Sequence, residues 1–108
     1  MDRELSPISF SDSSGRCILR LAGALGVADA ESICQAARQV CETGQDAVID
    51  WSAVTQLDAS IAQILLALRE ALKEQSKCLY SSSIPPTVHV WLKTAGLSPL
   101  LETALEAE

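Results

Sequence analysis

Ser60 and His89 are the residues whose types could together perform nucleophilic chemistry. A hydrolase of this kind needs the imidazole within hydrogen-bonding distance of the hydroxyl, and a third group that orients the imidazole. His89 is the only histidine, and helical spacing places it on the side away from Val88 and Leu92. The chain also lacks a Gly-x-Ser-x-Gly motif and a glycine-rich phosphate-binding loop. We therefore expect His89 to be a solvated surface residue, and the protein not to be an enzyme.

The aspartates Asp46, Asp50 and Asp58 could suggest a metal site, because carboxylates are hard-cation ligands. Asp58 suits the start of a helix, where its carboxylate can accept a backbone hydrogen bond. Asp50 suits a turn at the end of a strand. These structural roles account for two of the three carboxylates without a metal. We therefore expect neither a metal nor any other cofactor.

The 4 cysteines form no Cys-x-x-Cys pair. Cys34 and Cys41 are separated by about two helical turns, which is farther than a disulfide can reach. Without other ligands the same spacing is too wide for a compact zinc site. We expect Cys17, Cys34, Cys41 and Cys78 to be small core residues of a protein in a reducing compartment.

Ser60 belongs to the stretch around which the whole chain is organised. The apolar, β-branched run at residues 47–51 predicts a buried strand, and an amphipathic helix is predicted from Asp58 to about Gln75. At about 100° per residue, Ser60 falls on the flank of the apolar face, so its hydroxyl is expected to face solvent. Leu66 falls well outside that face, on the side of Ala59, Ala62 and Gln63. The inward residues, at helical spacing, are Ile61, Ile64, Leu65, Leu68 and Leu72.

This stretch resembles the core of a STAS domain, the fold of the anti-sigma factor antagonists. That family has a strand ending in aspartate, a short loop, and then Asp-Ser-Ser-Gly-Leu at the start of a helix. The corresponding residues are Asp50, followed by Asp58-Ala59-Ser60-Ile61-Ala62. The resemblance implies that a partner kinase phosphorylates Ser60, which holds the position of the second serine. Ile61 replaces the usual glycine, and in the register of stressosome-type relatives the acceptor position falls at Ala59.

Two further segments resemble the ends of elements in STAS domains. Gly23-Ala24-Leu25 matches the Gly-x-Leu that ends a strand, and Ala95-Gly96-Leu97 matches a Gly-Leu near the end of the domain. The family often has an acidic residue after the first segment, where this chain has Gly26, so nucleotide contacts are not carried over. The partner-binding surface that the resemblance implies comprises Leu25, Asp58, Ala59, Ser60, Ile61, Ala62, Gln63 and Leu66.

The order of elements, with a resemblance covering about residues 16–101, predicts an α/β fold of the STAS type in one domain, residues 1–108. The sheet is expected to be mixed, with four to five strands, and to carry its helices mainly on one face. Pro7 suggests that the first strand is an edge strand. Gly44 and Gly96 are expected to end the first and third helices. Strands are expected at 5–10, 16–22, 47–51 and 77–82, and helices at 27–43, 58–75, 87–95 and 99–108.

Charge and hydropathy restrict the partners. The net charge is −6 with a pI of about 4.6, and no Lys/Arg stripe exists to neutralise phosphates, so no nucleic-acid partner is expected. No apolar run is long enough to span a bilayer, so no membrane insertion is expected. The first residues lack the apolar segment of a signal peptide, which favours a cytoplasmic location.

The resemblance implies a bacterial protein-binding regulatory module, acting like an anti-sigma factor antagonist through phosphorylation-sensitive partner switching. Its implied partner is an anti-sigma factor of the serine-kinase type, or another signalling protein, and a weak homodimer is compatible with this class. The alternative is an unphosphorylated STAS scaffold subunit of a signalling assembly or lipid-transport complex. A nucleotide-binding role comes third.

Overall fold

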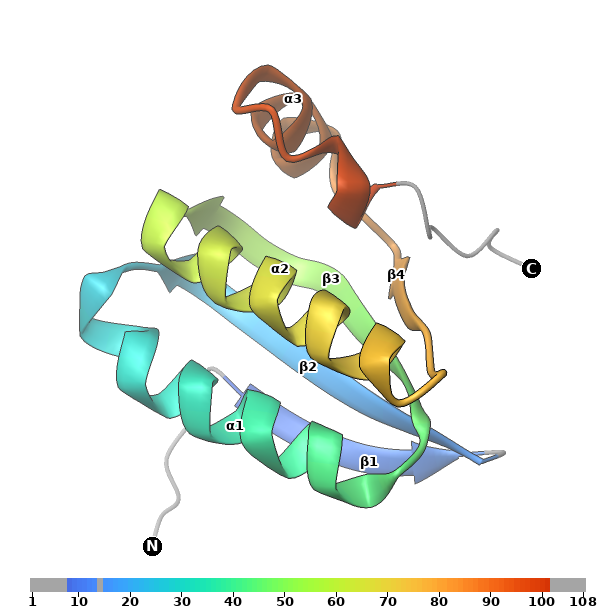
Figure 1. The fold of residues 1–108 in the computed structure, drawn as a ribbon. Coiled ribbons are helices and arrows are strands. Elements are labelled where there is room, and N and C mark those ends of the chain that lie inside the picture. The colour runs from blue at the N-terminus through green and yellow to red at the C-terminus, as the bar shows by residue number, and fades with distance from the viewer. Residues whose placement is uncertain (1–7, 14, 102–108) are drawn as a thin grey trace, which may run out of the picture.

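The sheet is mixed and has four strands, in the order β1-β2-β3-β4. The computed structural model describes residues 8–13 and 15–101 (Figure 1). β1 is antiparallel to β2, whereas β2, β3 and β4 run parallel to one another. The mixed sheet predicted from the sequence is thus confirmed. The strands are β1 (Ile8–Ser13), β2 (Arg16–Leu25), β3 (Asp46–Leu57) and β4 (Leu79–Ser82).

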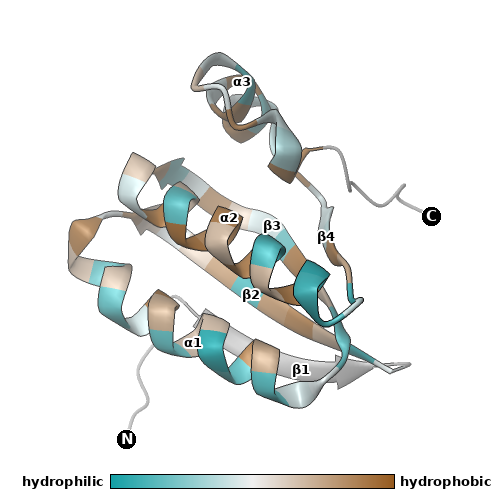
Figure 2. Cartoon of the chain, in the orientation of Figure 1, coloured by the Kyte–Doolittle hydropathy of each residue, from teal (hydrophilic) through white to brown (hydrophobic). Residues whose placement is uncertain are grey.

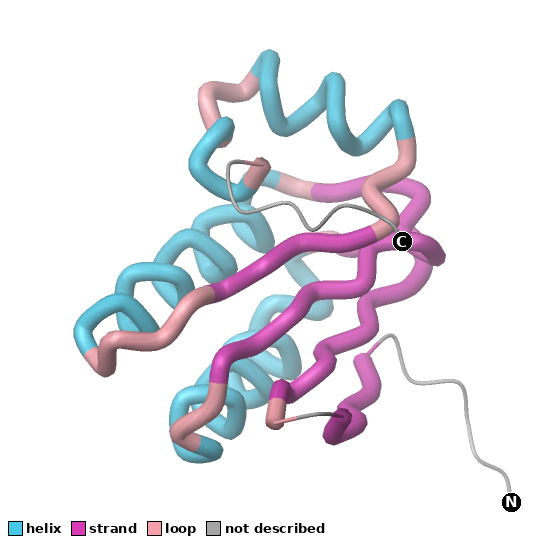
Figure 3. Tube along the Cα trace, turned by 90° about the vertical axis from the view of Figure 1, so that its right-hand side faces the viewer, coloured by secondary structure: helices cyan, strands magenta, loops and turns pink. Residues whose placement is uncertain are grey.

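The two long helices, α1 and α2, lie side by side across one face of the sheet (Figure 1 and Figure 3). The shorter α3 lies past the side of the sheet formed by β3 and β4, and it contacts β3. The helices therefore lie mainly on one face, as predicted. They are α1 (Ala30–Thr43), α2 (Ala59–Glu74) and α3 (Pro86–Thr94), with the short 3₁₀ helices η1 (Val27–Asp29) and η2 (Ser98–Leu100).

β3 is much longer than the sequence pattern indicated. It continues past Trp51 to Leu57, although polar residues interrupt this part. The buried side chains after Trp51 are Val54 and Leu57, which are spaced by three residues rather than two. The register between β2 and β3 shifts in the same stretch, so extra residues of β3 bulge out of the ladder. The expected loop after residue 51 was therefore wrong, because a period of two does not detect a bulged strand.

Other boundaries differ by a few residues. β2 extends to Leu25, and the predicted first helix begins with a 3₁₀ turn. The first strand covers Ile8–Ser13 rather than 5–10, and residues 5–7 lie outside the described residues. Of the last predicted helix, the 3₁₀ turn η2 is present, and residues 102–108 lie outside the described part.

The end of α3 confirms the predicted left-handed glycine. Gly96 has φ 79°, a conformation that glycine adopts without steric cost. The N–H of Leu97 donates to the carbonyl of Leu92 at 2.8 Å, and the N–H of Gly96 donates to that of Lys93 at 3.2 Å. This pair of bonds is a Schellman motif, and both Leu92 and Leu97 are buried. The motif turns the chain back toward α2.

The returning chain is attached to the sheet by a buried hydrogen bond. The hydroxyl of Ser81 in β4 donates to the carbonyl oxygen of Leu100 at 3.0 Å. Leu100 is 1% exposed, and η2 contacts α2 as well as α3. Figure 2 shows hydrophobic residues along β2, β3 and α2, the elements that enclose the core. The C-terminal segment thus closes the core on the side of α2 away from α1.

Candidate functional site

The ends of β2 and β3 lie next to each other at the point where α2 begins. Leu25 pairs with Leu57 in parallel register. The next residue, Asp58, donates its backbone N–H to the carbonyl oxygen of Leu25 at 3.0 Å. The carboxyl ends of two parallel strands therefore meet the N-terminus of a long helix, which is the edge where open α/β sheets commonly bind ligands.

A cleft with a volume of about 810 Å³ opens at this edge. We call it the strand-end cleft. Leu25, Leu57 and Val88 are buried and contribute apolar lining, and Trp91 of α3 is half-buried beside them. The other lining residues are Ala24, Gly26, Thr55, Gln56, Asp58, Ala59 and Thr87. The cleft therefore combines the ends of two strands, the start of α2 and one side of α3.

Asp58 takes the N-cap position of α2, as predicted, but its side chain does not cap the helix. Its backbone is extended, with φ −91° and ψ 153°, and its carboxylate makes no cap hydrogen bond. The first turn instead uses the backbone: the N–H groups of Ile61 and Ala62 donate to the carbonyl of Asp58 at 3.0 and 3.2 Å. The predicted side-chain bond is therefore wrong, and the exposed carboxylate is available at the cleft.

The hydroxyl of Ser60 does not face solvent. The Oγ atom is shielded from solvent and has no hydrogen-bond partner within the described chain, although the residue as a whole is half-buried. The expected exposed hydroxyl was therefore wrong in this side-chain conformation. Because a serine side chain has three staggered wells, a rotation about its Cα–Cβ bond is the movement that would bring Oγ to the surface. Ala59, the alternative position, is exposed.

Ile61 and Ala62 are core residues at 0% exposure, so their side chains cannot contact a partner in this structure. Ile61 was predicted to face inward, whereas Ala62 was expected on the outer side. The buried face of α2 is wider than its strongest apolar stripe, because the helix is contacted by α1 and η2 as well as by the sheet. Gln63 is exposed, as the helical wheel indicated.

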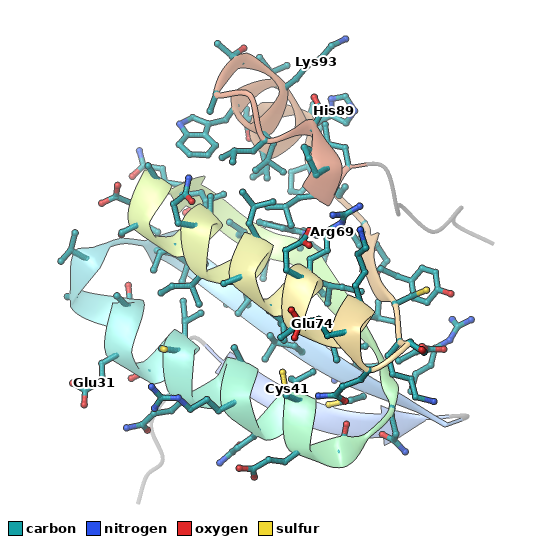
Figure 4. All side chains as sticks on the ribbon, viewed as in Figure 1. Glu31, Cys41, Arg69, Glu74, His89 and Lys93 are labelled. Atoms are coloured by element: carbon teal, nitrogen blue, oxygen red, sulfur yellow. The ribbon has the colours of Figure 1, made fainter. Side chains whose placement is uncertain are left out.

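Leu66 is a second correction to the helical wheel. It was expected to be exposed near Ser60, but it is half-buried and packs against the core cluster. Arg69 lies on the same side of α2, and in Figure 4 its side chain points toward the C-terminal segment. The Nε atom of Arg69 is also shielded from solvent. The wheel failed because it takes account of one helix alone, whereas η2 returns to cover this side.

Leu66→Asp is therefore expected to destabilise the protein by about 1–3 kcal/mol, since it places a charge in a half-buried apolar site. The matched control is Ala67→Asp, because Ala67 is the exposed neighbour in the same helix. Urea unfolding followed by circular dichroism measures both. Equal midpoints for the two variants would show that Leu66 contributes nothing to the core, and would restore the interpretation of Leu66 as a free contact residue.

Of the remaining predicted contact residues, Leu25 is 3% exposed and lines the cleft.

Thr87 and Trp91, which also line the cleft, were not predicted as site residues. They are four apart in α3 and so lie on one side of that helix. Each is followed directly by a buried residue, Val88 or Leu92, and this local pattern does not indicate a cleft. The position of α3 against the strand ends is set by the tertiary fold.

The other aspartates have partners within the fold. Asp46 accepts the backbone N–H of Cys78 at 2.9 Å, and Asp50 accepts that of Ser52 at 3.0 Å. Asp50 also pairs with Arg20 at 3.5 Å, and it lies inside β3 rather than at the strand end that was expected. Across residues 8–13 and 15–101, no group of three His, Cys, Asp or Glu side chains could hold a metal ion.

The cysteines are free, and only part of the prediction for them holds. Cys17 is buried, Cys34 and Cys41 are half-buried, and Cys78 is exposed, so Cys78 is not the core residue that was expected. Burial, followed by the charge of Glu42, raises the pKa of the Cys41 thiol, which disfavours its reactive thiolate.

His89 is exposed on α3 (Figure 4). None of the described helices is both long enough and apolar enough to cross a membrane.

Comparison with protein families identifies the class. The model described as "Mlab, STAS domain" matches residues 8–102, which is most of the chain. The chain therefore belongs to the STAS domain family. Comparison by sequence with curated proteins finds no match.

Solved structures of anti-sigma factor antagonists share the fold. Unphosphorylated SpoIIAA has 17% identity and a TM-score of 0.77, with 94% of this chain and 88% of that chain covered. Phosphorylated SpoIIAA from Bacillus has 16% identity and a TM-score of 0.72, with 94% and 91% covered. An anti-sigma factor antagonist from Mycobacterium paratuberculosis has 24% identity and a TM-score of 0.75, with 85% and 79% covered. At these identities the likeness is one of fold.

Proposed function

We propose that this chain is a non-catalytic, protein-binding regulatory module that holds its partner at the strand-end cleft and the start of α2. The observation that carries this proposal is the position of the cleft, where Asp58 and Ala59 are exposed beside the half-buried Trp91. Aromatic residues such as tryptophan are enriched at protein-binding surfaces, and the rim of such surfaces is polar. The partner is a protein of the anti-sigma factor or serine-kinase type, or another signalling protein.

In its finer form, the proposal is a partner switch controlled by phosphorylation of Ser60. SpoIIAA, which shares the fold, is known in a phosphorylated and an unphosphorylated form. Ser60 lies in the first turn of α2, directly after two residues that line the cleft. A phosphate on Ser60 would therefore place about −1.5 to −2 charges at the edge of the binding surface.

A second function is a constitutive scaffold subunit of a signalling assembly or a lipid-transport complex. The buried Oγ of Ser60 favours this alternative, because a kinase could reach the hydroxyl only after the side chain had rotated to the surface. The fully buried Ile61, at the position of the usual glycine, adds bulk beneath the same turn. Both functions use the same surface, and they differ in whether Ser60 is modified.

Both functions require that the partner binds at the strand-end cleft, and this is tested by a substitution that changes charge and size at the start of α2. The partner is the protein that co-purifies with the tagged chain from its own cell. Ala59→Arg is expected to weaken its binding by at least about tenfold in calorimetry, since the long side chain would obstruct the cleft. Gln75→Arg, at the exposed opposite end of α2, should bind like the original protein. Equal binding by both variants would reject the proposed surface.

A further inference from the structure

The lining of the strand-end cleft is partly apolar and includes a single ionisable side chain. Leu25, Leu57 and Val88 are between 2% and 8% exposed, so they present small areas of buried apolar surface. Trp91 offers a larger apolar surface, because it is half-buried while it lines the same cleft. Tryptophan is enriched among the residues that contribute most to the binding energy of protein interfaces.

The electrostatics of the cleft are acidic. Asp58 is the one ionisable residue among those that line it, and its carboxylate has no partner among the described residues. The whole chain carries a net charge of −6. The positive end of the α2 dipole offsets part of one carboxylate charge, since it corresponds to about half an elementary charge. An anionic ligand such as a phosphate would meet Asp58 without a cation to pair with, so the complementary occupant is cationic.

We propose that the strand-end cleft receives a protein segment that carries a large apolar side chain close to a lysine or arginine. The apolar side chain lies against Trp91 and the buried leucines, and the cation pairs with Asp58. This inference rests on the proposed function, because it specifies the chemistry of the partner that the same surface binds. The apolar contact supplies most of the affinity, whereas the ion pair, at the exposed rim, chiefly affects the association rate and its dependence on salt.

The probe is a synthetic peptide of about 12 residues, built from alanine and glutamine, with one leucine and one arginine four positions apart. Two matched peptides replace the arginine by glutamate or the leucine by alanine. Binding to the full chain is followed by NMR. The leucine and arginine peptide is expected to shift the amide signals of Gly26, Ala59 and Thr87 and the indole signal of Trp91. The peptide without leucine should bind at least about tenfold more weakly, and the peptide with glutamate severalfold more weakly.

Variants of the chain establish where the peptide binds. Thr87→Arg fills the cleft from an exposed position and adds a competing cation, so it should abolish the shifts without affecting the core. Asp58→Asn should lower the affinity severalfold and reduce its salt dependence. Val90→Ala and Glu74→Gln are the matched controls, because both residues are exposed and neither lines the cleft. They should bind the peptide like the original protein.

Equal binding of the arginine and glutamate peptides, shifts that survive Thr87→Arg, or no shift at millimolar peptide would each overturn the inference. The proposed function fails by a different result, namely that no co-purifying protein is sensitive to Ala59→Arg. A partner that binds this surface without a basic and apolar segment would therefore refute the inference and leave the proposed function standing.

Discussion

Replacing Ile61 by glycine is expected to remove roughly 2–6 kcal/mol of the free energy of unfolding. Truncating a buried isoleucine to alanine costs about 2–5 kcal/mol, and glycine within a helix costs up to about 1 kcal/mol more. Ile61 is 0% exposed and belongs to the central core cluster. Because small domains have total stabilities of about 5–15 kcal/mol, much of the protein would then be unfolded in mild denaturant.

Urea unfolding measures this effect, and Ile61→Val is the matched control, with an expected loss of about 0.5–1.5 kcal/mol. A loss below about 1 kcal/mol for Ile61→Gly would show that the start of α2 is not anchored by this side chain. A glycine at this position would leave a cavity in this chain, because the Ile61 side chain is fully buried.

Ser60→Asp is expected to weaken partner binding by orders of magnitude, whereas Ser60→Ala should bind constitutively. The cation of the partner pairs with the exposed Asp58, so a second carboxylate beside it would lose its water in the contact without a partner of its own, and a buried unpaired charge can cost several kcal/mol. The fold should change little, because rotation about the Cα–Cβ bond brings the carboxylate to the surface, where the α2 dipole favours an acidic residue in the first turn by about 0.3–1 kcal/mol. Calorimetry with the co-purified partner measures both affinities.

Ala67→Asp supplies the control for Ser60→Asp, since it places the same charge on an exposed part of α2 outside the lining of the cleft. It should bind the partner almost normally. Equal affinities of Ser60→Ala and Ser60→Asp would reject the switch and favour the scaffold function. Intact-mass measurement after incubation with a cognate kinase would then be expected to show no phosphate on Ser60.

The elements along the chain could be predicted because each has a local signal. The apolar spacing of residues 61–72 predicts α2, and Gly96 followed by Leu97 predicts the left-handed end of α3. The bulged end of β3 had no such signal, because its buried residues Val54 and Leu57 do not alternate. That missing part of the strand is also the part that lines the cleft.

The side-chain environments of the candidate site could be predicted only in part. Asp58, Ala59 and Gln63 are exposed as the sequence indicated. Ala62 and Leu66 were misplaced because a helical wheel takes account of one helix alone, whereas α2 is also contacted by η2, in a segment that the hydroxyl of Ser81 holds to the sheet. The cleft itself joins three segments that are distant in sequence, so no local pattern could indicate that Trp91 lies beside the start of α2.

The central claim, that a protein partner binds at the strand-end cleft, is tested most directly by amide hydrogen exchange with and without the co-purified partner. Slower exchange is expected at residues 24–26, 55–61 and 87–91, which line or adjoin the cleft. Residues 15–17 and 78–80, at the opposite ends of the parallel strands, should exchange unchanged. Protection confined to those opposite ends, with none at the cleft, would contradict the account.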